Sequence, residues 1–223
     1  MSSKKTKIFS VIFFSLLAVH ILLDNLNSFW SYFTKPALLG SLIVFFINES
    51  KHLQKRTRNV MLLALVFSLI GDLLLMFVDQ SPHFFTAGLA AFLLAHISYI
   101  VLFFKVKKGT YRNRGIGVFL IIILYFNIIL SLIHENLGEL HIPVLIYMAA
   151  IMSMFIVVAS RKGHVPKLSY TLVLVGAILF IISDSILALN KFYRPILFPQ
   201  VSIMLSYGLA QFLITLGVLK QEH

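Results

Sequence analysis

The sequence predicts an all-α integral membrane protein that crosses the bilayer eight times and forms a single domain over residues 1–223. Three observations lead to this fold class. First, 59% of the residues are hydrophobic and the mean hydropathy is +0.94, values that soluble domains of this size do not reach. Second, apolar runs of about 20 residues recur along the chain, as spanning helices require. Third, the basic residues gather in alternate loops between these runs.

Each apolar segment is expected to be helical, because an isolated strand would leave its backbone groups without hydrogen bonds in lipid. The first follows Lys4, Lys5 and Lys7 and lacks the small-residue cleavage site of a signal peptide, so we interpret it as a span. The second begins at Lys35-Pro36, which puts the proline in the first turn of a helix. The predicted spans are residues 8–24, 34–48, 59–79, 84–104, 115–133, 142–160, 168–190 and 197–219.

The charge distribution predicts the orientation of these spans. Sixteen of the 19 Lys and Arg residues fall at the two ends of the chain and in the loops over 51–58, 105–114 and 161–167. Because cytoplasmic loops carry an excess of Lys and Arg, both termini are predicted to be cytoplasmic. The basic surplus therefore indicates topology and not nucleic acid binding. The short loops favour a bacterial inner membrane, although an endomembrane protein would show the same pattern.

The two halves of the chain resemble each other, which indicates a parallel internal repeat of four spans plus four. Gly71-Asp72-Leu73-Leu74-Leu75 in span three is similar to Ser183-Asp184-Ser185-Ile186-Leu187 in span seven. Residues 88–93 in span four are similar to residues 208–213 in span eight. Both pairs are four spans apart, so each keeps its direction across the membrane. Chance similarity among leucine-rich helices is the alternative.

Two aspartates lie inside apolar spans, and both are candidate catalytic residues. A carboxylate in hydrocarbon costs several kcal/mol, so Asp72 and Asp184 are functional-site hypotheses by default. Each precedes a charged residue, Asp79 or Lys191, by seven residues. Seven residues make two helical turns, so both carboxylates are expected about 10 Å below the outer interface. We expect them to face each other across a central cavity.

Further polar side chains follow helical faces at a similar depth. Gly88, Phe92, His96 and Tyr99 share one face of span four, since their spacing is four, four and three residues. The stripe in span five consists of Asn127, Ser131 and His134, while Tyr147 comes from span six and Tyr207 and Gln211 from span eight. The alternatives are that His96, Asn127 and Gln211 only join helices by hydrogen bonds and that Tyr99 anchors an interface.

With these residues, the chain resembles the YhhN-like lysoplasmalogenase family of membrane proteins. The resemblance covers nearly the whole chain. The motif in span seven is the most specific. The matching motifs are Lys35-Pro36, Gly71-Asp72-x-x-Leu75, Phe85-x-x-Gly88-x-x-x-Phe92-x-x-x-His96-x-x-Tyr99, Tyr147, Gly176-Ala177-x-Leu179-Phe180-x-x-Ser183-Asp184-x-x-Leu187-Ala188-x-x-Lys191-Phe192 and Tyr207-x-x-Ala210-Gln211. The resemblance implies hydrolysis of the vinyl-ether bond of lysoplasmalogens with ethanolamine or choline headgroups, without a cofactor. The products would be a fatty aldehyde and a glycerophospho-alcohol.

Two carboxyl groups suit this reaction on chemical grounds. Protonation of a vinyl-ether carbon creates an oxocarbenium ion, much as in a glycosidase, so the site needs an acid, an anion and a base for water. Burial and a second carboxylate favour one protonated and one ionised Asp. The sequence leaves the two roles open, with Lys191 two turns after Asp184 weakly favouring Asp72 as the acid. The expected substrate-binding residues are Lys35, His96, Tyr99, Tyr147, Ser183, Lys191, Tyr207 and Gln211, with Arg194 as a third phosphate-binding cation.

Several functional classes are excluded or kept as rivals. The chain has no Cys and hence no disulfide, thiol nucleophile or Cys-ligated metal, and its eight His show no metal-binding helix spacing. We therefore expect no metal. A small secondary transporter is the main rival, because paired intramembrane carboxyls and parallel repeats occur there. A lipid-binding protein without catalysis is the second. The oligomeric state and the headgroup stay open.

Overall fold

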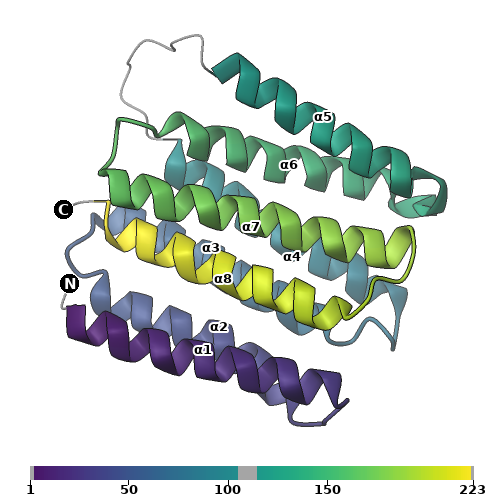
Figure 1. Cartoon of the computed structure of the whole chain (residues 1–223), viewed down its shortest axis with the longest axis horizontal. Coiled ribbons are helices and arrows are strands. Elements are labelled where there is room, and N and C mark those ends of the chain that lie inside the picture. The colour runs from purple at the N-terminus through teal and green to yellow at the C-terminus, as the bar shows by residue number, and fades with distance from the viewer. Residues whose placement is uncertain (1–2, 105–114, 222–223) are drawn as a thin grey trace.

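The computed structural model describes residues 3–104 and 115–221, and within these ranges the chain is helical without strands (Figure 1). Two short 3₁₀ turns, His134–Asn136 and Gly138–Leu140, precede the sixth helix. The predicted basic loop over 105–114 lies outside the described residues. The helices are α1 (Ser3–Asn25), α2 (Ser31–Glu49), α3 (Lys55–Leu75), α4 (Pro82–Phe103), α5 (Gly115–Ile133), α6 (His141–Ser160), α7 (Lys167–Phe192) and α8 (Pro199–Leu219).

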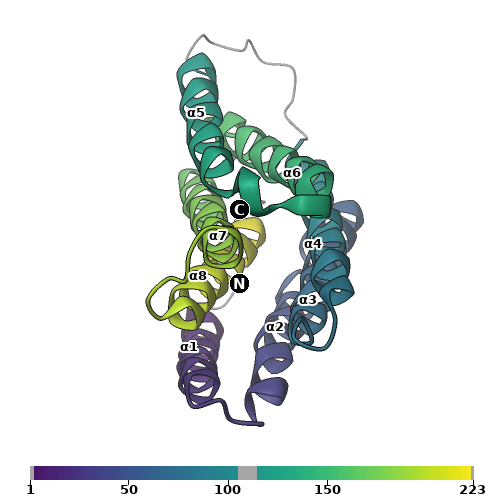
Figure 2. The same cartoon turned by 90° about the vertical axis from the view of Figure 1, so that its right-hand side faces the viewer.

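The helices run side by side along the long axis and form two layers (Figures 1 and 2). One layer holds α5, α7, α8 and α1, and the other holds α6, α4, α3 and α2. The most extensive helix pairs are α7 with α8 and α3 with α4, one pair in each layer. The two predicted aspartate-bearing helices, α3 and α7, therefore lie in opposite layers, and the space between the layers is where their side chains can meet.

The apolar runs identified the helices, and two boundary predictions were wrong. Span three was expected to reach residue 79, but α3 ends at Leu75, because the amides of Met76 and Phe77 bond to carbonyls three residues back. Pro36 was expected in a first turn, but α2 begins at Ser31 and Pro36 lies inside the helix. Lys35 consequently belongs to the body of α2 and not to its start.

Seven of the described helices are long and apolar enough to cross a membrane, which confirms a multi-pass membrane protein. The remaining helix, α5, contributes a shorter apolar segment, Leu120–Asn136, so the eighth crossing stays a prediction. Both termini lie at the same end of the bundle (Figure 1). Which side of the membrane this end faces, and whether the halves are a true repeat, also stay predictions.

Small residues allow the two principal helix pairs to pack closely. A Cβ added at Gly71 of α3 would lie 2.6 Å from ring atoms of Phe92 on α4. On the other side of the molecule, a Cβ at Gly217 of α8 would lie 2.5 Å from Val173 and 3.0 Å from its backbone nitrogen. Close contact of this kind replaces the hydrophobic drive that water supplies to soluble bundles. It fixes α3 against α4 and α7 against α8, and thereby the positions of Asp72 and Asp184.

Candidate active site

A pocket of about 280 Å³ is lined by residues of both layers, toward the helix ends that lie away from the chain termini. We call it the polar pocket. All six helices α1, α2, α3, α4, α7 and α8 contribute to its wall. Both predicted catalytic residues line it, so the chain brings Asp72 and Asp184 into one site. Its polar lining residues are Asp24, Lys35, Asp72, Ser183, Asp184, Asn190, Lys191, Gln200 and Tyr207.

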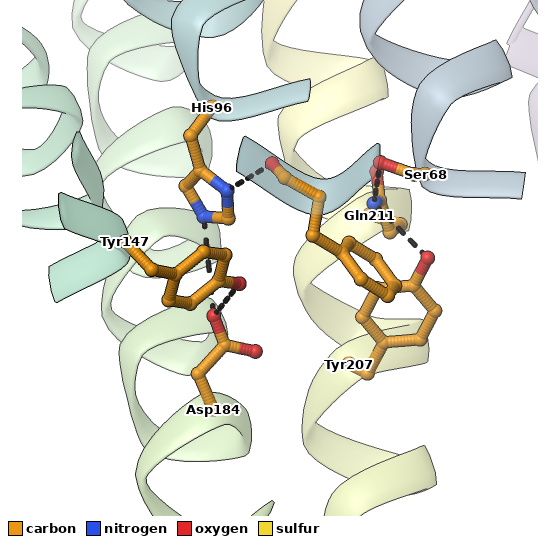
Figure 3. A network of polar contacts seen from close by, with 7 residues as sticks. Ser68, His96, Tyr147, Asp184, Tyr207 and Gln211 are labelled. Atoms are coloured by element: carbon orange, nitrogen blue, oxygen red, sulfur yellow. Dashed lines mark hydrogen bonds and ion pairs between the residues drawn. The ribbon is translucent and has the colours of Figure 1, made fainter. Parts of the chain in front are cut away.

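Asp72 is the more deeply buried carboxylate and belongs to a hydrogen-bonded chain. Only 4% of the residue is exposed, and its Oδ2 accepts a 2.8 Å hydrogen bond from the hydroxyl of Tyr207. The amide of Gln211 donates to the Tyr207 oxygen at 3.4 Å and to Ser68 Oγ at 3.0 Å, while its Oε1 accepts from Tyr99 at 2.7 Å. Each side chain of this chain has at least one hydrogen-bond partner in it, which favours a rigid arrangement. Figure 3 shows the part of the chain formed by Ser68, Gln211 and Tyr207.

Asp184 has a different set of neighbours on the opposite side of the pocket. Its Oδ2 accepts a 2.5 Å hydrogen bond from the hydroxyl of Tyr147, and the side chain is 18% exposed. The Nε2 atom of His96 lies 3.9 Å from the same oxygen, too far for a hydrogen bond. Figure 3 shows His96, Tyr147 and Asp184 gathered on one side and Ser68, Gln211 and Tyr207 on the other.

The hydrogen bonding of His96 places a hydrogen on Nδ1 of its ring. Its Nδ1 lies 2.7 Å from the carbonyl oxygen of Phe92, which can only accept, so Nδ1 carries a hydrogen. In the neutral ring Nε2 then keeps its lone pair, and it has no hydrogen-bond partner within the described part of the chain. His96 is fully buried and packs edge-on against Tyr147 and Phe180. The neutral ring therefore presents a hydrogen-bond acceptor, Nε2, to the side of Asp184, and no described residue donates to it.

The basic side chains at the site are distributed unevenly. Lys35 lines the polar pocket and is close enough to Asp72 for an electrostatic interaction. Lys191 also lines it, but its Nζ lies 4.4 Å above the ring of Phe85, and no ion pair with Asp184 is formed. Arg194, expected as a third cation, stacks on Tyr193 at 5.4 Å and is not among the pocket-lining residues.

A second, apolar pocket of about 60 Å³ adjoins the polar pocket. It lies among α4, α5, α6 and α7 and is lined by side chains such as Phe126, Ile129 and Met148. The two pockets have lining residues in common, and one of them is Asp184. Asp72, in contrast, lines only the polar pocket. Asp184 thus lies at the junction of a polar and an apolar space. The shared lining residues are Leu75, Phe85, Phe92, Asp184 and Leu187.

The remaining predicted residues divide into two groups. Tyr99 is fully buried and bonded to Gln211, so the interfacial-anchor alternative for it was wrong. Ser183 lines the polar pocket, where its hydroxyl donates to the carbonyl of Ile203 at 3.1 Å. The stripe in span five faces away from the site, since Asn127 and Ser131 are exposed and bond to carbonyls of their own helix.

Sequence reasoning missed several residues of the site. Ser68 and Asp24 were passed over because serine is common in helices and Asp24 follows the apolar run of the first span. One helical turn separates Ser68 from Asp72, a spacing that could have indicated a shared face. Asn190 and Gln200 lie at helix ends, where polar residues are expected anyway. Among the described residues, no group of three His, Asp or Glu could hold a metal ion.

Comparisons with known proteins identify the family of the chain. The model of the YhhN family matches residues 30–218. This chain belongs to the YhhN family. The human protein named Lysoplasmalogenase TMEM86B is 33% identical over 158 residues, which are 70% of this chain and 62% of that protein. The match therefore spans less than two thirds of the human relative. No solved structure matches the chain.

Proposed function

We propose that this chain hydrolyses the vinyl-ether bond of lysoplasmalogens, releasing a fatty aldehyde and a glycerophospho-alcohol. The observation that carries the proposal is the location of Asp184 at the junction of the polar and apolar pockets, with Asp72 on the wall of the same polar pocket. A lysoplasmalogen is divided in the same way into an apolar and a polar part, since its alkenyl chain and its charged headgroup portion meet at the ether bond. Membership of the YhhN family and the name of the human relative support the same substrate class.

The position of Asp184 favours it as the acid. In a vinyl ether the proton must be delivered to the carbon one bond further along the chain than the carbon bound to oxygen. With the chain in the apolar pocket and the headgroup in the polar pocket, this carbon lies on the apolar side of the ether oxygen, where Asp184 is the shared carboxylate. Asp72 lines only the polar pocket, on the headgroup side. It is therefore suited to stabilise the oxocarbenium carbon and to take a proton from the attacking water.

The charges near the two carboxylates favour the same assignment. Lys35 interacts with Asp72 and stabilises its ionised form, whereas Lys191 stacks on Phe85 and makes no ion pair with Asp184. The two carboxylates repel each other, so the pair prefers a single negative charge. This reverses the weak preference for Asp72 as acid that the spacing to Lys191 suggested. The difference arises because Lys191 points to an aromatic ring rather than along its helix to Asp184.

The reaction then balances with the two carboxyls alone. Asp184 gives its proton to the vinyl carbon that is not bound to oxygen, and the electron pair of the double bond forms the new C–H bond and leaves an oxocarbenium ion. Water adds to the oxocarbenium carbon, the one bound to the ether oxygen, while Asp72 takes one of the protons of this water. In the resulting hemiacetal, Asp184 takes the hydroxyl proton, the C–O bond breaks, and Asp72 protonates the departing alkoxide. Aldehyde and alcohol leave, and both carboxyls return to their first state.

The other polar residues orient these groups. Tyr147 donates to Asp184 and stabilises the carboxylate that forms when the proton leaves, while Tyr207 holds Asp72 in one rotamer. Gln211 donates to the Tyr207 oxygen and is itself held by Ser68 and Tyr99, so these three residues fix the position of Tyr207. Lys35 and Lys191 bind the phosphate, so neutralising either should raise KM more than it lowers kcat.

The direct test is an aldehyde-release assay on protein purified in mild detergent, with lysoplasmenylethanolamine as substrate. The variants are Asp72→Asn, Asp184→Asn and Asp79→Asn, the last being a matched control because Asp79 is exposed and does not line the pocket. We expect turnover by wild type and Asp79→Asn and a loss in the other two variants.

Absence of aldehyde from folded, monodisperse wild type would overturn the proposal. Uptake of unchanged substrate by vesicles that contain the protein would then favour the transporter alternative. Turnover that survives in both variants would keep the hydrolase but remove the carboxyl pair from its mechanism.

A further inference from the structure

The mouth of the polar pocket carries charges of both signs. We define the pocket mouth as Asp24, Lys35, Asn190, Lys191 and Gln200. Lys35 lies in the second turn of α2, and the other four lie at the ends of α1, α7 and α8 that face away from the chain termini. Lys35 and Lys191 suit a phosphate group. Asp24 has the opposite charge, and an anionic side chain beside a phosphate site would weaken phosphate binding unless the ligand also carries a cation.

In the part of the chain that the structure describes, the carboxylate of Asp24 has no bonding partner that would give it a structural role. Within the described residues its carboxylate accepts no hydrogen bond and makes no ion pair, although its backbone carbonyl accepts the amide of Asn27 at 3.0 Å. The side chain interacts electrostatically with His20, one turn earlier on α1. His20 is 1% exposed and is held at its Nδ1 by Thr34, at 3.0 Å, so it does not reach into the pocket. The Asp24 carboxylate therefore keeps its capacity to bind a ligand.

We propose that Asp24 determines headgroup specificity by binding the positively charged amino group of a zwitterionic lysophospholipid. This inference rests on the proposed function, because it places the phosphate at Lys35 and Lys191 and the reacting ether bond deeper, between Asp72 and Asp184. A phosphoethanolamine or phosphocholine headgroup has its cation two carbons from the phosphate oxygen, so both charges fit within one mouth. A lysolipid that ends in a bare phosphate has only negative charge, and Asp24 repels it.

Such a residue acts on selectivity more than on affinity. Discrimination between two ligands arises from attraction to one and repulsion of the other. Replacing Asp24 by Asn keeps the size of the side chain and removes its charge. The substitution should weaken binding of the zwitterion and strengthen binding of the bare phosphate, which a merely structural role would not do. Exposed Asp79, at the same end of the bundle but outside the pocket, is the matched control for bulk charge.

The test measures binding of two saturated alkyl analogues that the enzyme cannot cleave. Both are 1-O-alkyl-glycerophospholipids of one chain length, one with an ethanolamine headgroup and one with a bare phosphate. Their dissociation constants are determined by ligand-induced thermal shift in a neutral detergent for wild type, Asp24→Asn and Asp79→Asn. We expect wild type to prefer the ethanolamine analogue, and we expect Asp24→Asn to reduce this preference about tenfold. Asp79→Asn should leave it within about twofold.

A preference that is the same in wild type and Asp24→Asn would overturn the proposal, as would wild type that prefers the bare phosphate. Because the analogues lack the vinyl group, this result does not depend on turnover. Failure of aldehyde release with intact discrimination at Asp24 would count against the proposed hydrolysis alone. Aldehyde release with no effect of Asp24→Asn on the preference would count against the headgroup assignment alone.

Discussion

The surroundings of Asp72 and Asp184 differ, although both residues occupy similar sequence motifs in spans of the same direction. Asp72 is bonded to Tyr207, whose oxygen is in turn reached by Gln211, and Lys35 lies nearby. Asp184 has Tyr147 as its hydrogen-bond donor, Nε2 of His96 at 3.9 Å and an apolar pocket at its side. Similar motifs therefore present one carboxylate to a polar network and the other to hydrocarbon.

This difference shows how one chain can separate an acid from an anion without different residue types. Each carboxyl group has one tyrosine donor, so the difference lies elsewhere. A nearby cation favours the ionised form of a carboxyl group, and apolar surroundings favour its neutral form. The two helices that carry the pair lie in opposite layers of the bundle, so each carboxylate draws its neighbours from a different set of helices. The functional division of the site follows from the layer arrangement.

The largest expected effect comes from neutralising the carboxylates one at a time. Asp184→Asn should lower kcat by about 10³-fold, because it removes the proton that creates the oxocarbenium ion. Asp72→Asn should lower kcat by about 10²-fold, since water retains some reactivity toward that ion. Single-turnover aldehyde release measures both values. A larger loss in Asp72→Asn than in Asp184→Asn would reverse the two roles.

A smaller effect is expected from the tyrosines that donate to each carboxylate. Tyr147→Phe should lower kcat by roughly 10- to 150-fold with little change in KM, because a hydrogen bond to a developing carboxylate is worth about 1.5–3 kcal/mol. Tyr207→Phe should lower kcat and in addition the melting temperature, because Gln211 loses a partner. Steady-state kinetics and thermal unfolding in the same detergent separate these outcomes. Equal melting temperatures for the two variants would contradict the difference in networks.

The polar network itself should contribute to stability more than to chemistry. Gln211→Leu leaves the hydroxyls of Tyr99 and Ser68 buried without a partner from α8, at about 1–3 kcal/mol for each unsatisfied group. We expect a clear loss of thermal stability. Ser183→Ala provides the comparison, because its hydroxyl donates to a single carbonyl, that of Ile203. A melting temperature of Gln211→Leu at or above that of Ser183→Ala would contradict the network's structural role.

The smallest effect is expected in the apolar pocket. Its volume of about 60 Å³ is well below the ~150 Å³ of a cavity that binds benzene, so it admits only the first carbons of the chain. Ala188 lines this pocket one turn after Asp184, and Ala188→Leu should fill it and raise KM about tenfold. Ala188→Gly serves as the control of opposite volume. An unchanged KM in Ala188→Leu would place the chain elsewhere.

Much of the fold could be predicted from the sequence because hydropathy alone identifies membrane helices. The apolar runs gave each helix within a few residues, and the four-residue spacing from Gly88 to His96 correctly indicated a buried face of α4. The end of α3 and the start of α2 could not be predicted. Both depend on local turn hydrogen bonds at Met76 and Trp30, which no hydropathy pattern reports.

Side-chain partners were beyond prediction for a different reason. The stripe in span five had the same spacing as a buried stripe, yet Asn127 and Ser131 face outward, because the neighbours of α5 cover only its other side. The direction of Lys191 toward Phe85 likewise depends on α4, which is about 100 residues away in sequence. Spacing shows which residues share a face, whereas packing decides what that face meets.

Solvent deuterium labelling tests the central claim most directly, namely that a carboxyl protonates the vinyl carbon at the junction of the two pockets. Lysoplasmenylethanolamine is hydrolysed by the protein in D₂O, the aldehyde is reduced at once to the alcohol, and its label is located by mass spectrometry. An authentic fatty aldehyde treated in the same way corrects for exchange. We predict one deuterium at the carbon next to the former aldehyde carbon. Product without that deuterium would contradict carbon protonation and, with it, the proposed role of Asp184.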